Sequence, residues 1–215
     1  LMRAIQYIPQ GVLLAVVDPG VGTERKPIAL DTEWGVMIGP DNGLLNLACA
    51  TVGGAQRGYL LENEDWIIPS EGNTFHASGL FSPFAAGYAS WQLSIEDFGS
   101  ELDLSNLNQY LIPLTEATDS EIKGEILWVD HYGNCQTNVS PEELRELKKS
   151  IGDVINIKIG NAEIKTTWVD SYQGEYLGEV GLITDSWGMV SLFATNKNAS
   201  SILNIKDGVK INFSI

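Results

Sequence analysis

Short apolar runs that end at glycine and proline dominate the first half of the chain. Residues 12–17 (Val-Leu-Leu-Ala-Val-Val) are all apolar, and Gly20 and Gly22 follow closely. A short apolar run with such an end is typical of a buried strand, so we predict a strand over Val12 to Val17. Ligands of open α/β sheets bind beyond the carboxyl ends of strands. The opposite charges of Asp18 and Arg25, in the loop that follows, therefore indicate a candidate site.

The next segment repeats this arrangement of strand, polar loop and helix. Strands are predicted over Pro27 to Leu30 and over Val36 to Ile38. The loop Gly39 to Gly43 follows, and leucine and alanine recur at helical spacing from Leu44 to Ala48. The sequence Pro-Asp-Asn-Gly in this loop is also what a simple tight turn uses, so the loop has a purely structural interpretation as well.

A third polar loop contains one of the two histidines. Residues 73–79 read Asn-Thr-Phe-His-Ala-Ser-Gly, and a helix is predicted to begin near Phe81 and to include Trp91. The backbone N–H groups at a helix start are unpaired and favour anions, which makes His76 a candidate for chemistry. A histidine with a purely structural role is the alternative. Trp66, Trp91 and Trp128 are predicted to lie in the core.

The second half of the chain is rich in strands. Residues 94–120 are acidic and polar and are predicted to be a linker. Beyond it, Ser140 to Glu143 has the pattern of a capping box that starts a short helix, and Ile155 to Ile159 alternates as a half-buried strand does. Several short strands separated by glycine turns indicate a small barrel or a sandwich.

Charge and composition exclude several classes of function. The net charge is −15, which leaves no basic surplus for binding nucleic acid or an anionic membrane. Cys49 and Cys135 form no zinc or disulfide pattern, and two histidines are few for a metal site. No apolar run reaches the ~18 residues of a membrane span. We therefore expect a soluble, cytoplasmic protein without a bound metal. The start at Leu1 suggests a missing N-terminal piece.

Three residues remain as candidates for catalysis: Asp18, Arg25 and His76. The loop from Gly20 to Lys26 lacks the spacing of a phosphate-binding loop, and no serine or cysteine has the setting of an activated nucleophile. An Asp, an Arg and a His together can orient and polarise a water molecule or an anion. These residues alone leave the reaction open.

Five motifs resemble those of the S-adenosylmethionine (SAM) hydroxide adenosyltransferase family, the SAM hydrolases, which are related to the SAM-dependent fluorinase and chlorinase. They occur in the family's order and span nearly the whole chain. The motifs are VVDPGVGTERKPIA at 16–29, GPDNGLL at 39–45, NTFHASGLFSPFAA at 73–86, VDHYGNCQTN at 129–138 and TDSWGMVSLF at 184–193.

The resemblance implies a fold and an assembly. Residues 1–118, linker included, would form an N-terminal α/β domain with a Rossmann-like sheet truncated at its N-terminus. Residues 119–215 would form a small all-β barrel that contributes to adenine binding. Members form homotrimers that bind SAM between subunits. The implied reaction is hydrolysis of SAM to adenosine and methionine by hydroxide attack at the ribose C5', with SAM as substrate and no further cofactor.

The resemblance also assigns site residues. The family's catalytic Asp, Arg and His correspond to Asp18, Arg25 and His76. Substrate contacts are implied or predicted for Phe75, Ala77, Asp130, Tyr132, Asn134, Ser186, Asn198 and Ala199.

One motif departs from the family pattern. The family usually reads Phe-His-Gly-Arg-Asp where this chain has Phe75-His76-Ala77-Ser78-Gly79. A noncatalytic protein that binds SAM or adenosine, and an enzyme that uses a halide in place of hydroxide, are the alternative functions.

Overall fold

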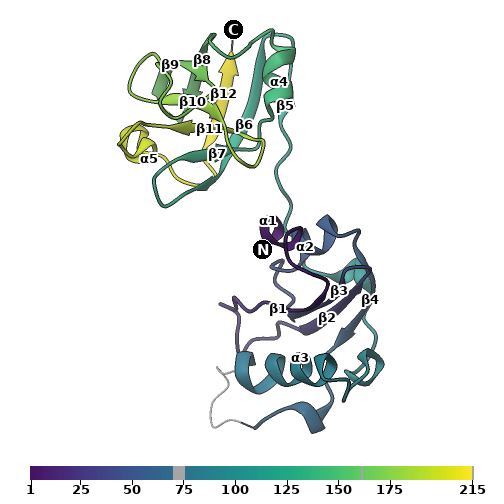
Figure 1. The fold of residues 1–215 in the computed structure, drawn as a ribbon. Helices are drawn as coiled ribbons and strands as arrows, with labels where there is room; N and C mark the ends of the chain where they lie inside the picture. The colour runs from purple at the N-terminus through teal and green to yellow at the C-terminus, as the bar shows by residue number, and fades with distance from the viewer. Residues whose placement is uncertain (70–75, 161, 215) are drawn as a thin grey trace. The chain divides into compact units, whose positions relative to one another are not determined.

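The computed structural model describes residues 1–69, 76–160 and 162–214, which divide into two compact units. Unit 1 is Leu1–Leu111 and unit 2 is Ile112–Ile215 (Figure 1). Each unit has its own buried apolar clusters, so each is described by itself.

A mixed four-stranded sheet is the centre of unit 1. The strands β1 (Gly11–Leu14), β2 (Pro27–Thr32), β3 (Gly35–Pro40) and β4 (Ala55–Leu60) lie in the order β1-β3-β2-β4. Among these strands, β1 and β3 pair in parallel, whereas β2 is antiparallel to both β3 and β4. The unit is therefore an α/β arrangement in which the parallel pairing expected of a Rossmann-like sheet is limited to β1 and β3.

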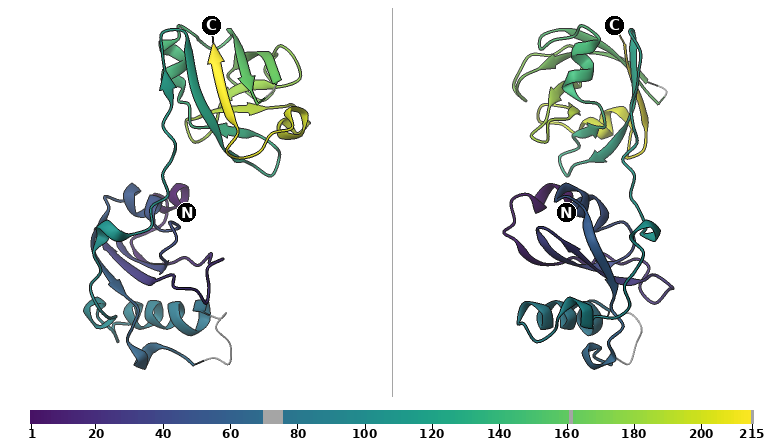
Figure 2. Two further views of the ribbon diagram at one scale, coloured as in Figure 1. Left: turned by 180° about the vertical axis from the view of Figure 1, so that it is seen from behind. Right: turned by 90° about the vertical axis from the view of Figure 1, so that its right-hand side faces the viewer.

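Helices cover both faces of this sheet (Figures 1 and 2). Along β3, Val36 and Ile38 pack with the cluster around α3, and Met37 packs with the cluster on the opposite face. A strand buried on both faces is apolar at every position, which is why the predicted strands read as continuous apolar runs. The helices are α1 (Met2–Ile5), α2 (Asn46–Thr51), a π-helical turn (Ala77–Phe81) and α3 (Ser82–Ala89), with short 3₁₀ turns at Glu64–Trp66, Ile95–Asp97 and Leu104–Asn106.

Residues 94–107, which we predicted to be linker, pack onto unit 1. Ile95 and Phe98 are buried in the cluster around α3, and the carbonyl of Ser100 accepts a hydrogen bond from the N–H of Leu60. This segment is therefore part of the folded unit.

Unit 2 is a closed seven-stranded β-barrel with β5 (Glu116–Ala117) added beside β6. The barrel order is β12-β8-β9-β10-β11-β7-β6, and pairing of β12 with β6 closes it. Among its described pairs, β9 with β10 is parallel and the others are antiparallel. The strands are β6 (Glu121–Val129), β7 (Cys135–Thr137), β8 (Val154–Ile159), β9 (Ala162–Val169), β10 (Gly181–Thr184), β11 (Val190–Phe193) and β12 (Lys210–Ser214), with helices α4 (Pro141–Glu146) and α5 (Ala199–Leu203).

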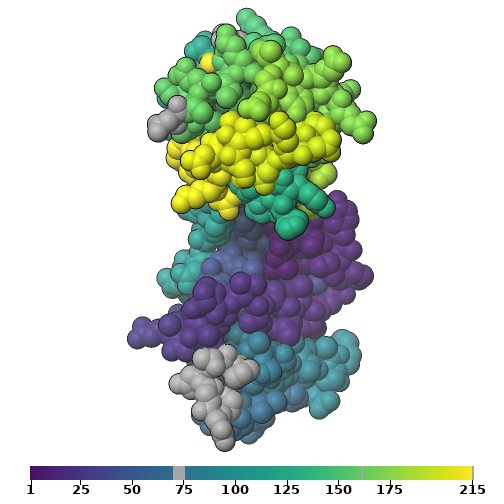
Figure 3. Space-filling view, turned by 90° about the vertical axis from the view of Figure 1, so that its left-hand side faces the viewer, coloured from purple at the N-terminus to yellow at the C-terminus, as the bar shows by residue number. Residues whose placement is uncertain are grey.

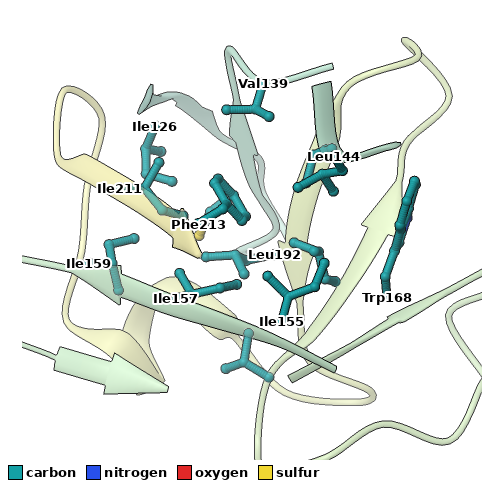
Figure 4. Close-up of a cluster of buried hydrophobic side chains, with 14 of the residues drawn as sticks. Ile126, Val139, Leu144, Ile155, Ile157, Ile159, Trp168, Leu192, Ile211 and Phe213 are labelled. Atoms are coloured by element: carbon teal, nitrogen blue, oxygen red, sulfur yellow. The ribbon is translucent and has the colours of Figure 1, made fainter. Parts of the chain in front are cut away.

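The barrel interior confirms the predicted strand alternation. Ile155, Ile157 and Ile159 of β8 all point inward and are buried, and Phe213 of β12 lies among them (Figure 4). The capping box that begins α4 is also confirmed. Ser140 Oγ accepts the N–H of Glu143, whose carboxylate accepts the N–H of Ser140 at 2.7 Å.

Three expectations about apolar residues were wrong. The first strand ends at Leu14, and Val17 is 66% exposed. Trp91 follows the end of α3 with a left-handed backbone (φ 62°) and is 94% exposed. Trp128 is also exposed, whereas Trp66 is half-buried against the α3 cluster. Within the described ranges, no helix is both long enough and apolar enough to cross a membrane.

Candidate active site

The Asp18–Arg25 loop lies at the edge of the sheet where the parallel strands β1 and β3 end. The N–H of Ala15 donates to the carbonyl of Ile38 at 3.0 Å, so the chain follows β3 for one residue beyond β1. It then leaves the sheet and forms local turns, in which the N–H of Val21 donates to the carbonyl of Asp18. β2 runs antiparallel to β3, so β2 begins at the edge of the sheet where β3 ends. The loop therefore leaves β1 and enters β2 at the same edge.

Asp18 and Arg25 form a nearly buried pair with two contacts. Arg25 Nε donates to Asp18 Oδ1 at 3.1 Å, and Arg25 Nη2 donates to Asp18 Oδ2. The side chains are 6% and 7% exposed, respectively. A guanidinium and a carboxylate joined by two parallel hydrogen bonds have a fixed mutual geometry. Both carboxylate oxygens of Asp18 therefore hold Arg25 in place.

His76 joins this pair from a segment 51 residues later. Arg25 Nη2 lies 3.0 Å from His76 Nδ1. An arginine nitrogen can only donate, so Nδ1 accepts, and the proton of the neutral ring is on Nε2. Phe81, from the first turn of the same helical segment, lies under the Arg25 guanidinium at 5.2 Å from Cζ to the ring centroid. The structure thus brings together all three residues that we predicted to be catalytic.

The third guanidinium nitrogen of Arg25, Nη1, takes part in none of these contacts. Nη1 is buried and has no hydrogen-bond partner in the described part of the chain. A buried donor without a partner costs about 1–3 kcal/mol, and more for a charged group, so this atom is suited to a bound anion or water molecule.

In unit 2, Asp130 organises the turn between β6 and β7. Its Oδ1 accepts the N–H groups of Tyr132 (2.9 Å) and Asn134 (2.8 Å), and its Oδ2 accepts Asn134 Nδ2 at 2.8 Å. Tyr132 is 77% exposed. Asp130 therefore fixes the turn, and the turn presents Tyr132 to solvent.

The start of α5 is joined to this turn. The N–H of Ser200 donates to the carbonyl of Gly133 at 3.0 Å. Asn198 caps α5 by accepting the N–H of Ser201 at 2.8 Å, and Ala199 is fully buried in the barrel. Figure 3 shows the C-terminal segment, in yellow, bordering green-teal residues from the earlier part of this unit.

A cleft of about 1080 Å³ opens beside this turn and α5. This exceeds the volume of ~300–1,000 Å³ common for small-molecule pockets. Of the residues predicted to bind substrate, Asp130, Tyr132, Asn134 and Asn198 line it, while Ser186 and Ala199 are not among its lining residues. Ser186 lies exposed in a separate turn. Phe75 lies outside the described residues.

The sequence prediction missed Tyr172 and Gln173, which also line the cleft. Tyr172 packs edge-on against Phe193 with 5.1 Å between ring centroids. Burial, followed by the charges of Asp185 and Asp130, raises the pKa of its phenol. An aromatic residue in the polar, glycine-containing sequence Asp-Ser-Tyr-Gln-Gly was the available signal.

Cys135 lies next to the cleft and is not suited to be a nucleophile. It is buried, and burial raises the pKa of its thiol to about 12. The reactive form of cysteine is the thiolate, so this group is inert at neutral pH.

Sequence profiles of known families match both halves of the chain. The profile of the SAM hydroxide adenosyltransferase N-terminal domain matches residues 1–99, and that of the C-terminal domain matches residues 124–212. The chain belongs to the SAM hydroxide adenosyltransferase family.

Relatives and solved structures agree with this membership. An (R)-S-adenosyl-L-methionine hydrolase of Salinispora tropica is 36% identical over 98% of this chain and 77% of the relative. One of Thermus thermophilus is 30% identical over 98% and 79%. A crystal structure of an uncharacterized conserved protein from Thermotoga maritima superposes with a TM-score of 0.84 at 27% identity, covering 99% of this chain and 80% of that one.

The segment that departs from the family pattern begins the helix beside Arg25. Ala77 opens the π-helical turn, and both the N–H and the hydroxyl of Ser82 donate to its carbonyl. The carbonyl of Gly79 accepts the N–H of Ile68 at 2.8 Å, and a Cβ on Gly79 would lie 3.0 Å from the Ile68 oxygen. Gly79 stands where the family has aspartate, and its missing side chain allows the backbone of Ile68 to lie close to it.

In the parts of the chain that the structure describes, no cluster of three or more His, Cys, Asp or Glu side chains could hold a metal ion.

Proposed function

We propose that this protein hydrolyses SAM to adenosine and methionine. Its membership of the SAM hydroxide adenosyltransferase family and the names of its relatives support this function. The single structural observation in favour is the buried Nη1 of Arg25, which has no partner among the described residues and lies in a cluster with Asp18 and His76.

The reaction needs little acid or base chemistry from the protein. Hydroxide would attack the ribose C5', so that a C–O bond forms while the C–S bond to the sulfonium breaks. The electron pair of that bond stays on sulfur, and methionine leaves as a neutral thioether that needs no proton. Catalysis then consists of holding hydroxide in line with the bond that breaks and stabilising its charge.

The residues of unit 1 would divide this task. Arg25 Nη1 would donate to the hydroxide, and His76 Nε2–H would supply a second donor. Asp18 would act through Arg25, because both of its oxygens already accept from that side chain. In this proposal neither Asp18 nor His76 removes a proton from water. The site would instead favour hydroxide electrostatically, so we expect the rate to rise with pH.

The cleft of unit 2 would hold the adenosyl group. Tyr132 and Asn134 would contact adenine, with Asn198 at the edge of the same cleft. Asp130 would accept a hydrogen bond from the methionine amino group. Its Oδ2 accepts only one hydrogen bond within the turn, from Asn134 Nδ2, and so would be the acceptor. SAM would be the substrate and no other cofactor would be required.

We further propose that SAM binds between subunits of a homotrimer, with unit 1 of one chain facing unit 2 of another. The division of the predicted site residues between two separate units supports this arrangement.

The Rossmann-like character of unit 1 also stays a proposal, supported by the parallel pair β1 and β3.

Incubation of the purified protein with SAM tests the function, with adenosine followed by chromatography. Both sulfonium epimers are supplied, because the relatives are named for the (R) form. We expect adenosine without added halide. Retention of SAM with no adenosine would favour a noncatalytic binding protein, and a halogenated nucleoside formed only with halide would favour a halide-using enzyme.

A further inference from the structure

We propose that the turn Pro40–Gly43, which follows β3, sets the position of the Asp18–Arg25 loop, and that Asn42 is a positioning residue for hydrolysis. The proposal rests on the proposed function, since it concerns how the same three residues are aligned.

The turn holds the loop at both ends. Asn42 Nδ2 donates to the carbonyl of Val17 at 2.8 Å. The N–H of Asp41 donates to the carbonyl of Lys26 at 2.9 Å. Val17 directly precedes Asp18, and Lys26 directly follows Arg25. Two adjacent residues of one turn thus fasten both sides of the segment that carries the ion pair.

The turn is itself fixed within unit 1. The carboxylate of Asp41, a buried residue, accepts the N–H of Asn108 at 2.9 Å and its side-chain amide at 3.1 Å. Asn42 Oδ1 accepts the N–H of Leu44 at 3.1 Å, which fixes the side chain that reaches Val17. Gly43 has a φ of 88°, and its missing Cβ allows Tyr110 to lie close by. The turn that holds the loop is therefore itself hydrogen-bonded to a distant segment of unit 1.

Hydrogen bonds inside the loop fix its shape but not its position. They join residues three apart, such as Val21 to Asp18 and Thr23 to Gly20. At the loop entrance, Val16 packs against the cluster around α3, whereas Val17, which directly precedes Asp18, is exposed. In-line attack tolerates only displacements well below 1 Å. The bonds from the turn to the loop backbone therefore add to the contacts that His76 and Phe81 make with the Arg25 side chain, and together they would keep Nη1 where hydroxide must lie.

Replacing Asn42 by alanine tests the proposal. We expect Asn42→Ala to lower kcat about tenfold with little change in KM for SAM, because the loop loses alignment while the adenosyl site in unit 2 is untouched. Asn63→Ala is the matched control. Asn63 also accepts a nearby N–H, from Asp65 at 3.2 Å, and donates to a distant carbonyl, that of Asp97 at 2.9 Å. We expect this variant to keep the kcat of the unaltered protein.

A double-variant comparison separates positioning from general destabilisation. If Asn42 acts through Arg25, Asn42→Ala should slow hydrolysis much less in an Arg25→Lys background than in the unaltered protein. Equal effects in both backgrounds, or equal kcat values for Asn42→Ala and Asn63→Ala, would overturn the proposal.

A failure of the proposed function can be told apart by nuclear magnetic resonance. If the unaltered protein forms no adenosine, the Nε–H of Arg25, which donates to Asp18, still reports on the loop. We expect its exchange with solvent to speed up in Asn42→Ala and to stay unchanged in Asn63→Ala. Unchanged exchange in Asn42→Ala would overturn the positioning role independently of activity.

Discussion

Two arginines of unit 1 show how surroundings give one residue type different roles. Arg57 contacts Asp31 and Glu96 at 2.8 Å each, with its own side chain 43% exposed. Arg25 contacts Asp18 and His76 but is nearly buried. Water can serve every spare donor of Arg57, whereas the spare Nη1 of Arg25 has lost that option. Burial leaves this donor of Arg25 unpaired among the described residues, whereas those of Arg57 are open to water.

Arg25→Lys keeps the charge but loses the planar fork that contacts Asp18 and His76 together. We expect kcat for SAM hydrolysis to fall by about 10²–10³, the effect typical of removing one preorganised donor. Steady-state assays of adenosine release measure it, and Arg57→Lys is the control that should stay near the original rate. Similar losses in both variants would contradict a special role for Arg25.

Unit 2 contains two turns with the same internal design. The N–H of Asp130 and of Asp185 each donates to the carbonyl of the residue four positions later, and each Asp carbonyl accepts the N–H of the glycine three positions later. Each of the two side chains also accepts two N–H groups on Oδ1. Gly133 and Gly188 occupy the same place, with φ of 86° and 76°. The turns differ in surroundings: a Cβ on Gly133 would lie 2.1 Å from Asn198, whereas a Cβ on Gly188 would meet nothing within 4 Å.

Alanine at each glycine separates backbone strain from this contact. Gly188→Ala should cost about 1–2 kcal/mol of the free energy of unfolding, from the left-handed conformation alone. Gly133→Ala should cost a further ~1–3 kcal/mol, because Asn198 at the start of α5 must move. Denaturant titration measures both values. Equal losses would show that the turn and α5 are not tightly joined.

The predicted site residues are divided between the two folded units. Asp18, Arg25 and His76 belong to unit 1, while Tyr132 and Asn134 belong to unit 2. Each unit has buried clusters of its own. The proposed active site would therefore need residues from both units.

Mixed assemblies of two inactive variants test the proposed site between subunits. Arg25→Ala damages unit 1, and the double variant Tyr132→Ala with Asn134→Ala damages unit 2. Unfolding and refolding an equal mixture should restore about a quarter of the original activity, since random pairing in a ring makes that share of sites intact. Each variant refolded alone is the control. A site built within one chain would recover nothing.

Local sequence signals were sufficient for much of this protein. The alternation of Ile155 to Ile159, the capping box at Ser140 and the nomination of Asp18, Arg25 and His76 followed from spacing, turn chemistry and residue type. Strand alternation, helix caps and turn loops depend on residues that are close together in the sequence, so the sequence pattern alone can predict them.

Long-range contacts decided the rest. The tertiary structure set the antiparallel direction of β2, exposed Trp91, brought Tyr172 to the cleft and left one nitrogen of Arg25 without a partner among the described residues. Strand direction and burial depend on segments far apart in the chain, which meet only after folding. The sequence nominated Asp18, Arg25 and His76, and the tertiary contacts determined which of their atoms are paired with one another.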